Sequence, residues 1–437
     1  ECERETDIRL LINIFSQMQI RRPRLRVFLT SRPELPVRLV FSEVRGTYQD
    51  LVLHEMPLQI VEHDISTFLA NEFRKIRDDF NKIVGDERKL PSDWPGQQIL
   101  QDLTQMAVPL FIFAATVCRF VSDRRWNPQT RLRKVLDHRN KSHGSQLDQT
   151  YGPILRSLIT EVPKADREEI FKNFRTIVGS IVTLASPLSV TSLSQLLDVS
   201  PDVVDERLDA LHSVLSIPLR RTLPVRLLHL SFRDYLVTEK SEFQVDEIVI
   251  HRNLARHCLR LMRGALRENI CGISFPGMRR SAVGGAQIEE CIPPELQYAC
   301  MYWAHHHMKV DFEPADSHEV YDFLTIYFLY WVETLSLMGR SGESLDSIRS
   351  LMEWLEASLF YNLNLFNFLA DAVRFLQTNF SMINEAPLQL YSSALIFAPK
   401  RSIIRRTFEH NIPEWLTTWP QVKENWDACL LTLEGHS

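Results

Sequence analysis

The chain has 437 residues, of which 45% are hydrophobic and 24% are charged. This composition excludes a disordered protein because it can fill sizeable hydrophobic cores, and the length predicts about two to four domains. The formal net charge of −5 argues against a general nucleic-acid-binding protein. The seven cysteines include no CxxC pair and no secretory signal opens the sequence, so we expect a reduced, cytoplasmic protein.

The first 60 residues alternate between helical and extended patterns. Apolar residues recur at helical spacing over 8–18 and predict an opening helix. The continuous apolar run within 26–29 is typical of a strand buried on both faces of a parallel sheet. A loop with two prolines follows, and a short strand is predicted over 51–54. We interpret residues 1–60 as the end of an α/β sheet that is too small to fold alone.

A helical pattern begins near residue 61. Ile65, Phe68, Leu69 and Phe73 fall on one helical face, and two further helices are predicted before residue 122. We therefore assign residues 61–125 to a helical domain. The basic residues that follow show no clear periodicity, so 126–165 is predicted to be a linker with one helix near its end.

Residues 166–242 form a compact predicted unit of three helices and a β-hairpin. The hairpin joins strands within 214–217 and 225–230, and the second helix is expected to be capped by Thr191 or Ser192. Three short helices followed by a hairpin is the layout of a winged-helix domain. The second helix carries no Lys or Arg over 193–197, which gives little support to DNA binding.

Residues 243–428 are predicted to form a helical domain packed by aromatic side chains. The most apolar stretch, 321–333, is too short to span a bilayer and predicts a buried helix. The run His305 to His307 predicts a helix end at the surface, because consecutive histidines on a helix point in different directions and make a poor metal site. The basic segment 399–406 is interpreted as a solvated face. No metal site is predicted.

Arg32 is the first candidate functional residue. Ligands of open α/β sheets bind outside the carboxyl ends of the strands, and Arg32 lies shortly beyond the predicted strand 26–29. A guanidinium there has the reach and the fixed charge to touch a phosphate. The run Thr30-Ser31-Arg32-Pro33-Glu34 also resembles the sensor strand of NACHT-type signalling NTPases, a branch of the STAND group of P-loop ATPases. This resemblance implies that Arg32 contacts the γ-phosphate of a nucleotide; the alternative is an ordinary surface arginine.

Three further residues carry the same resemblance. The start Glu1-Cys2-Glu3 is similar to the sequence that follows the Walker B strand in fungal NACHT proteins, which implies that Glu1 polarises the attacking water as a general base. The run Ala107-Val108-Pro109 resembles a Gly-x-Pro motif whose proline lies against the adenine. The segment 227–236 resembles the winged-helix segment that places a histidine, here His229, on the β-phosphate of ADP.

Each of these three residues has a structural alternative. Glu1 would then be an exposed N-terminal glutamate, and Pro109 would begin the next helix, where its fixed φ is favourable. His229 would be a histidine at a strand-to-helix junction, with Ser231 as the N-cap of the helix.

The end of the chain, 429–437, resembles the first strand of a WD repeat. The resemblance therefore covers nearly the whole chain and implies a mainly α fold with a small α/β remnant. That fold comprises the tail of a P-loop NTPase sheet, a helical domain, a winged-helix domain and an all-helical superstructure before WD repeats. We expect the chain to be the middle of a longer fungal NACHT and WD-repeat protein.

The resemblance implies a slow switch between ADP and ATP, or the guanine nucleotides, with Mg²⁺ and self-association on activation. A protein ligand would bind the WD repeats, with no nucleic acid and no membrane span. The sequence contains no GxxxxGK(S/T) loop, so we expect this chain alone to hold no tightly bound nucleotide and to be inactive. Two alternatives stay open: a non-enzymatic helical scaffold with a degenerate NTPase remnant, and a winged-helix DNA-binding regulator.

Overall fold

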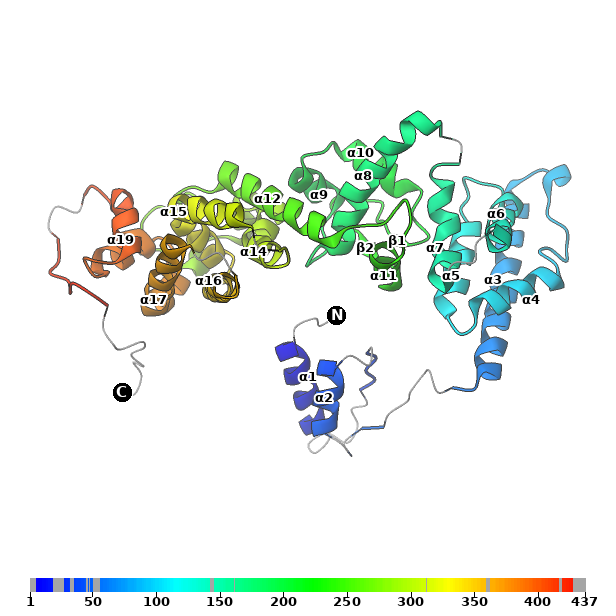
Figure 1. Cartoon of the computed structure of the whole chain (residues 1–437), viewed down its shortest axis with the longest axis horizontal. Helices are drawn as coiled ribbons and strands as arrows, with labels where there is room; N and C mark the ends of the chain where they lie inside the picture. The colour runs from blue at the N-terminus through cyan, green and yellow to red at the C-terminus, as the bar shows by residue number, and fades with distance from the viewer. Residues whose placement is uncertain are drawn as a thin grey trace. The chain divides into compact units, whose positions relative to one another are not determined.

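The computed structural model describes residues 5–18, 27–31, 35–44, 46, 48–49, 56–141, 145–160, 162–311, 313–358, 362–415 and 419–426. Helices make up most of these residues, which confirms the mainly α prediction (Figure 1). The chain divides into two compact units, Glu1–Thr67 and Phe68–Ser437.

The first unit contains helices α1 (Glu5–Met18) and α2 (Leu35–Glu43), which pack against each other. Helix α1 confirms the predicted opening helix and buries Ile12. Helix α2 occupies part of the loop that was predicted between the strands 26–29 and 51–54. Pro36 is the second residue of α2, where a missing N–H leaves no helical bond unmade.

The prediction of a buried strand over 26–29 is wrong for the described part of that segment. Residues 27–31 have no regular secondary structure, and Phe28 is 85% exposed. A strand of a parallel sheet is buried only when neighbouring strands and helices cover it. Among the described residues of this unit no strand is present to pair with the segment, and the predicted strand 51–54 lies outside the described residues.

Helix α3 (Leu58–Ile83) buries Ile65, Leu69 and Phe73 as predicted, whereas Phe68 of the same predicted face is only half-buried. In the second unit the helical domain continues with a short 3₁₀ turn and four helices, each packing on the next from α4 to α7. Their bounds are Asp86–Arg88 for the 3₁₀ turn, Gln97–Ala107 (α4), Phe111–Val121 (α5), Pro128–Lys141 (α6) and Gln146–Ser157 (α7).

Residues 126–165 were predicted to be a linker with one helix near its end. Helix α7 confirms that helix, but α6 occupies much of the predicted linker, so the linker part of the prediction is wrong. Helix α6 buries Leu132 and Val135, but two other positions on the same face are the polar residues Arg131 and His138. Because polar side chains occupy half of these buried positions, the apolar residues alone do not show the helical period.

The predicted three helices and hairpin are confirmed over 164–227, and a fourth helix follows the hairpin. The strands β1 (Leu215–Ser216) and β2 (Arg226–Leu227) pair antiparallel, with Leu215 opposite Leu227. The N-cap of α9 is Ser189 rather than Thr191 or Ser192, because its side chain accepts the Ser192 N–H. The helices are α8 (Lys164–Thr183), α9 (Val190–Leu197), α10 (Pro201–Asp209) and, after the hairpin, α11 (Ser231–Thr238).

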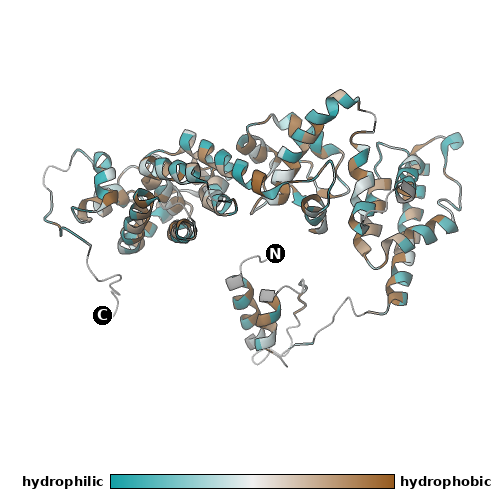
Figure 2. Ribbon diagram, viewed as in Figure 1, coloured by the Kyte–Doolittle hydropathy of each residue, from teal (hydrophilic) through white to brown (hydrophobic). Residues whose placement is uncertain are grey.

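The rest of the described chain is helical, as predicted. Figure 2 shows polar and apolar residues alternating along these helices, as expected for helices that bury one face. Two 3₁₀ turns, Arg280–Ala282 and Glu409–Asn411, and a π-helical turn, Leu390–Ala394, join them. The helices are α12 (Glu247–Ala265), α13 (Gly285–Cys291), α14 (Pro294–Met308), α15 (Pro314–Leu337), α16 (Ser341–Glu356), α17 (Leu363–Glu385), α18 (Leu395–Phe397) and α19 (Ile403–Thr407).

Aromatic side chains fill the core between α14 and α15. The indoles of Trp303 and Trp331 meet edge to face with ring centroids 5.6 Å apart, and the Trp331 N–H donates to the Cys300 carbonyl at 2.8 Å. Both rings are fully buried. The apolar stretch 321–333 lies within α15 and is a buried helix, as predicted. In the described part of the chain, no helix is long and apolar enough to cross a membrane.

Two minor predictions for this region are wrong. His306 and His307 are buried instead of exposed at a helix end, because α14 packs them against α12 and α15. Within the basic segment 399–406, Arg405 is also buried. Its guanidinium donates to the Ala398 carbonyl and lies 5.3 Å from the centroid of the Trp419 ring. Lys400 and Arg401 remain exposed, as predicted.

Candidate functional site

Two of the four predicted site residues lie in the described part of the chain. These are Pro109 and His229, and both belong to the second unit. Glu1, Arg32 and the predicted start of a WD repeat at 429–437 lie outside the described residues. The contacts around Pro109 and His229 therefore define the candidate site.

Pro109 lies in the turn between α4 and α5. The residue is exposed, and the Val108–Pro109 peptide bond is cis. Helix α5 begins at Phe111 with Leu110 as its N-cap, so Pro109 precedes the helix and does not start it as the structural alternative required. The side-chain amide of Gln146, at the start of α7, donates to the Val108 carbonyl at 3.0 Å and to the Met106 carbonyl at 3.2 Å.

His229 lies between the β-hairpin and α11, and it is exposed. Its Nδ1 accepts the backbone N–H of Ser231 at 3.1 Å and lies 2.7 Å from Ser231 Oγ. The histidine ring therefore satisfies the first N–H of α11, and Ser231 is not the N-cap that the structural alternative named. Because Nδ1 is an acceptor, the neutral ring carries its hydrogen on Nε2, which is then a donor.

Tyr151 of α7 contacts the junction between His229 and α11. Its hydroxyl lies 2.7 Å from Ser231 Oγ in a buried hydrogen bond, and its ring packs 5.1 Å from that of Phe232. Burial raises the pKa of the Tyr151 hydroxyl, with Arg119 and Asp234 as the charged groups that act on it. The hydroxyl is therefore neutral at physiological pH and orders Ser231, which in turn holds the imidazole of His229.

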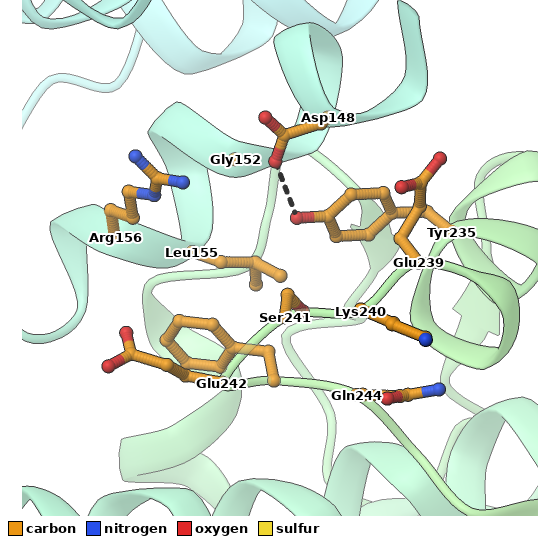
Figure 3. A pocket seen from close by; sticks show the side chains of 11 residues that line it. Asp148, Gly152, Leu155, Arg156, Tyr235, Glu239, Lys240, Ser241, Glu242 and Gln244 are labelled. Atoms are coloured by element: carbon orange, nitrogen blue, oxygen red, sulfur yellow. Dashed lines mark hydrogen bonds between the residues drawn. The ribbon is translucent and has the colours of Figure 1, made fainter. Parts of the chain in front are cut away.

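A polar cluster also involves α7, and Figure 3 shows the hydrogen bond between its Tyr235 and Asp148 side chains. Tyr235 of α11 donates to Asp148 Oδ1 at 3.1 Å, and Asp148 Oδ2 lies 3.3 Å from Nε2 of His138 on α6. Burial lowers the pKa of His138, and it raises the pKa of the Tyr235 hydroxyl. The cluster lies beside a hollow of about 700 Å³, whose rim carries the charged residues Arg156, Glu239, Lys240 and Glu242.

Helix α7 thus supports both candidate residues. Gln146 holds the turn of Pro109, and Tyr151 holds Ser231 and His229. The two supports are five residues apart, which corresponds to about 7.5 Å along a helix axis. Sequence reasoning missed both supports. It placed Gln146 in a linker and Tyr151 in the helix near the end of that segment, and a lone Gln or Tyr gives no signal of its partner.

We expect Gly152→Ala to destabilise this junction by roughly 1–3 kcal/mol. A methyl group at residue 152 would lie 2.7 Å from His138 Nε2 and 2.9 Å from Asp148 Oδ1. The matched control is Gly264→Ala in α12, where the methyl meets nothing within 4 Å. That change should stabilise the helix by up to about 1 kcal/mol. Urea unfolding of both variants measures the difference, and equal effects would contradict the close packing at Gly152.

Among the described residues no group of three His, Cys, Asp or Glu side chains is placed to hold a metal ion. Exposed His229 with an Nε2 donor is suited to binding an anionic ligand, and the charge of Arg119 acts on the neighbouring Tyr151 hydroxyl.

Comparison with known proteins adds one relative. No family model matches the sequence. The chain is 26% identical over 353 residues to "Vegetative incompatibility protein HET-E-1" of Podospora anserina, a match that covers 75% of this chain and 25% of the relative. This match supports a chain of the fungal NACHT and WD-repeat type. The chain spans about a quarter of the relative's length.

Proposed function

We propose that this chain is part of a NACHT-type signalling NTPase that switches between an ADP-bound closed form and an ATP-bound, self-associating form. The observation that carries the proposal is the shared support of Pro109 and His229 by α7. If one nucleotide contacts both residues, its base and its phosphates are sensed by one rigid helix. We place the protein in the cytoplasm, with a protein ligand acting through WD repeats.

Each candidate residue has a role in this proposal. Pro109 lies against the purine, His229 Nε2 donates to the β-phosphate of ADP, and Arg32 contacts the γ-phosphate of ATP. Glu1 polarises the attacking water. The sequence has no GxxxxGK(S/T) loop, so the phosphate cradle and the Mg²⁺ ligands belong to a longer protein in this proposal.

The energy of the switch limits what His229 alone can do. Moving a two-state equilibrium from 1:99 to 99:1 needs about 5.5 kcal/mol of differential binding. A hydrogen bond to a charged group contributes about 1.5–3 kcal/mol, so the histidine supplies at most about half. Arg119, which acts on the Tyr151 hydroxyl, is a candidate for part of the remainder.

We expect His229→Ala to weaken ADP binding by roughly tenfold to 100-fold and to favour self-association. The measurement is ADP and ATP affinity, with sedimentation, in a protein that carries this chain together with its phosphate-binding loop. Tyr151→Phe should have a smaller effect in the same direction, because it removes only the hydroxyl that orders Ser231. ATP binding through Arg32 should be spared.

His212→Ala is the matched control, since His212 is a half-exposed histidine in the same unit. It should leave ADP affinity unchanged. Unchanged ADP affinity in His229→Ala as well would contradict the proposed contact. If the unmodified protein binds neither nucleotide, the helical scaffold becomes the better interpretation.

A further inference from the structure

A second hollow, of about 360 Å³, lies between α6, the end of α7 and helices α8 and α10. None of its lining residues takes part in the hydrogen bonds around Pro109 and His229. Its lining includes the exposed ring of Trp126 and four cationic side chains, those of Arg125, Arg131, Lys134 and Arg207.

The cations around this hollow exceed the carboxylates. Arg125 and Arg131 share the single carboxylate of Asp123, at 3.0 and 3.3 Å. Arg207 pairs with Glu206 at 3.2 Å, but its Nε is buried and has no hydrogen-bond partner. With Lys134 and Asp209 included, four cationic side chains stand against three carboxylates.

Lys134 in particular has no carboxylate partner within the described part of the chain. Its Nζ lies 5.7 Å from the centroid of the Trp126 ring. An ammonium group in this position is attracted to the ring, and its charge can pair with the charge of a bound anion.

The guanidinium of Arg131, one of the lining residues, is held in place by its contacts. Arg131 is only 5% exposed, and its guanidinium lies 4.1 Å from the centroid of the Phe120 ring and 5.2 Å from that of Trp126. A guanidinium whose orientation is already fixed loses little side-chain entropy when it binds a phosphate.

Apolar residues also line the hollow. They are Leu158, Ile170 and Phe174, and the lining residue Trp126 is 44% exposed. A hollow lined by cations and by aromatic and aliphatic side chains fits a ligand that carries both a charge and a ring. Its volume falls within the range of small-molecule sites.

We propose that this hollow binds a small phosphate monoester that carries an aromatic ring. The phosphate pairs with Lys134 and with the guanidinium groups of Arg131 and Arg207, and the ring packs on Trp126 and the apolar lining residues. Phosphate suits the site better than a single carboxylate because it offers three oxygens and up to two charges to several cations. The site is separate from the nucleotide contacts proposed for Pro109 and His229.

The test is calorimetric titration of the whole 437-residue chain with phenyl phosphate at low salt. Inorganic phosphate, which lacks the ring, and benzyl alcohol, which lacks the charge, are the comparison ligands. We expect phenyl phosphate to bind more tightly than either, and its affinity to fall as salt is added. Equal affinity for phenyl phosphate and inorganic phosphate would overturn the role of the ring, and absence of binding would overturn the site.

Variants assign the binding to this hollow. Arg207→Gln should weaken phenyl phosphate binding by roughly tenfold, and Lys134→Met by roughly threefold to fivefold. Trp126→Leu should remove the preference for phenyl phosphate over inorganic phosphate. Lys172→Met, an exposed lysine of α8 outside the hollow, is the matched control and should have no effect. Binding that is unchanged in both Arg207→Gln and Lys134→Met would overturn the proposal.

Discussion

Glu333→Ala is expected to lower the free energy of unfolding by about 4 kcal/mol, one of the largest effects of any single substitution in this chain. The Glu333 carboxylate is fully buried in α15. It accepts the backbone N–H groups of Asn269 and Ile270 at 3.0 and 3.1 Å, and the Tyr391 hydroxyl at 2.6 Å. Alanine would leave these three donors buried without an acceptor and would open a cavity.

Glu319→Ala is the matched control, because Glu319 lies on the same helix but is partly exposed and pairs loosely with Arg263 at 3.7 Å. Its loss should cost at most about 1 kcal/mol. Urea unfolding of the two variants at pH 6 measures the difference. Similar losses in both would contradict the buried acceptor role of Glu333.

The ionisation of Glu333 gives the same prediction a pH signature. Burial raises the pKa of Glu333 from its ordinary 4.5 to about 7, although the bonds from Tyr391, Asn269 and Ile270 oppose the shift. A raised carboxyl pKa means that the folded protein binds the proton more tightly than the unfolded chain does. The stabilising contribution is therefore complete below pH 4.5 and is lost as the pH rises through 7.

The rise of the Glu333 pKa from 4.5 to about 7 corresponds to about 3 kcal/mol in the free energy of unfolding. Glu333→Gln, which cannot ionise, should remove this part of the pH dependence. If the unfolding free energy of the original chain and that of Glu333→Gln change in parallel between pH 4.5 and 8, the buried carboxyl does not titrate in this way.

The helices were the part of the fold that the sequence predicts best. Helices such as α3 and α15 bury long apolar faces, and their periodicity is visible without any knowledge of their neighbours. Helix α6 was missed because Arg131 and His138 occupy its buried face, and their partners Asp123 and Asp148 come from other elements.

The predicted strand at 26–29 failed for the opposite reason. Its apolar run is a strong local signal, but burial of a strand depends on neighbours that a local pattern cannot supply. Among the described residues of that unit, the structure shows exposed chain at 27–31.

The candidate site shows the same division. Pro109 and His229 stand out by their resemblance to family motifs, and the structure places both next to α7. Their supports, Gln146 and Tyr151, could not be predicted, because each acts through a hydrogen bond to a residue 38 or 80 positions away in the sequence. Long-range polar contacts of this kind leave no periodic pattern.

Acidification from pH 6.5 to pH 4 is expected to cost the fold at least about 3 kcal/mol through the buried histidines of α12 and α14. His251 Nδ1 lies 2.8 Å from His306 Nδ1, and His306 Nε2 lies 2.8 Å from the Tyr298 hydroxyl. Only one hydrogen fits between the two Nδ1 atoms. Full protonation of both rings would place a hydrogen on each Nδ1 and set two N–H groups against each other.

Burial is the main cause of the low pKa values in this cluster. It lowers the pKa of His251 to about 4 and that of His307 to about 4, and it lowers the pKa of His306 well below its ordinary value. In the unfolded chain these histidines take up protons near pH 6.5. Their stabilising contribution is therefore complete above pH 6.5 and is lost as the pH falls towards 4. The charged groups that act on them are His305, Glu247, Lys309 and Arg233 for His251, and Arg256 and Arg263 for His307.

The measurement is urea unfolding at pH 7 and pH 4.5. His251→Gln should reduce the loss between these two values, because glutamine cannot take up a proton. His318→Gln, an exposed histidine on α15, is the matched control and should keep the full loss. Equal losses in both variants would show that other groups govern the acid response.

A local measurement separates this cluster from general acid unfolding. The backbone N–H of Ala185, just after α8, donates to the Tyr298 hydroxyl at 3.1 Å. The same hydroxyl lies 2.8 Å from His306 Nε2, so these contacts connect Ala185 to the histidine pair. Protonation of His306 would therefore disturb the hydroxyl group on which the Ala185 amide depends. Hydrogen exchange at Ala185, corrected for the intrinsic pH dependence, should therefore lose protection before the amides of the α15 core do. Simultaneous loss at both places would show that the fold opens as one unit, without an earlier step at the histidines.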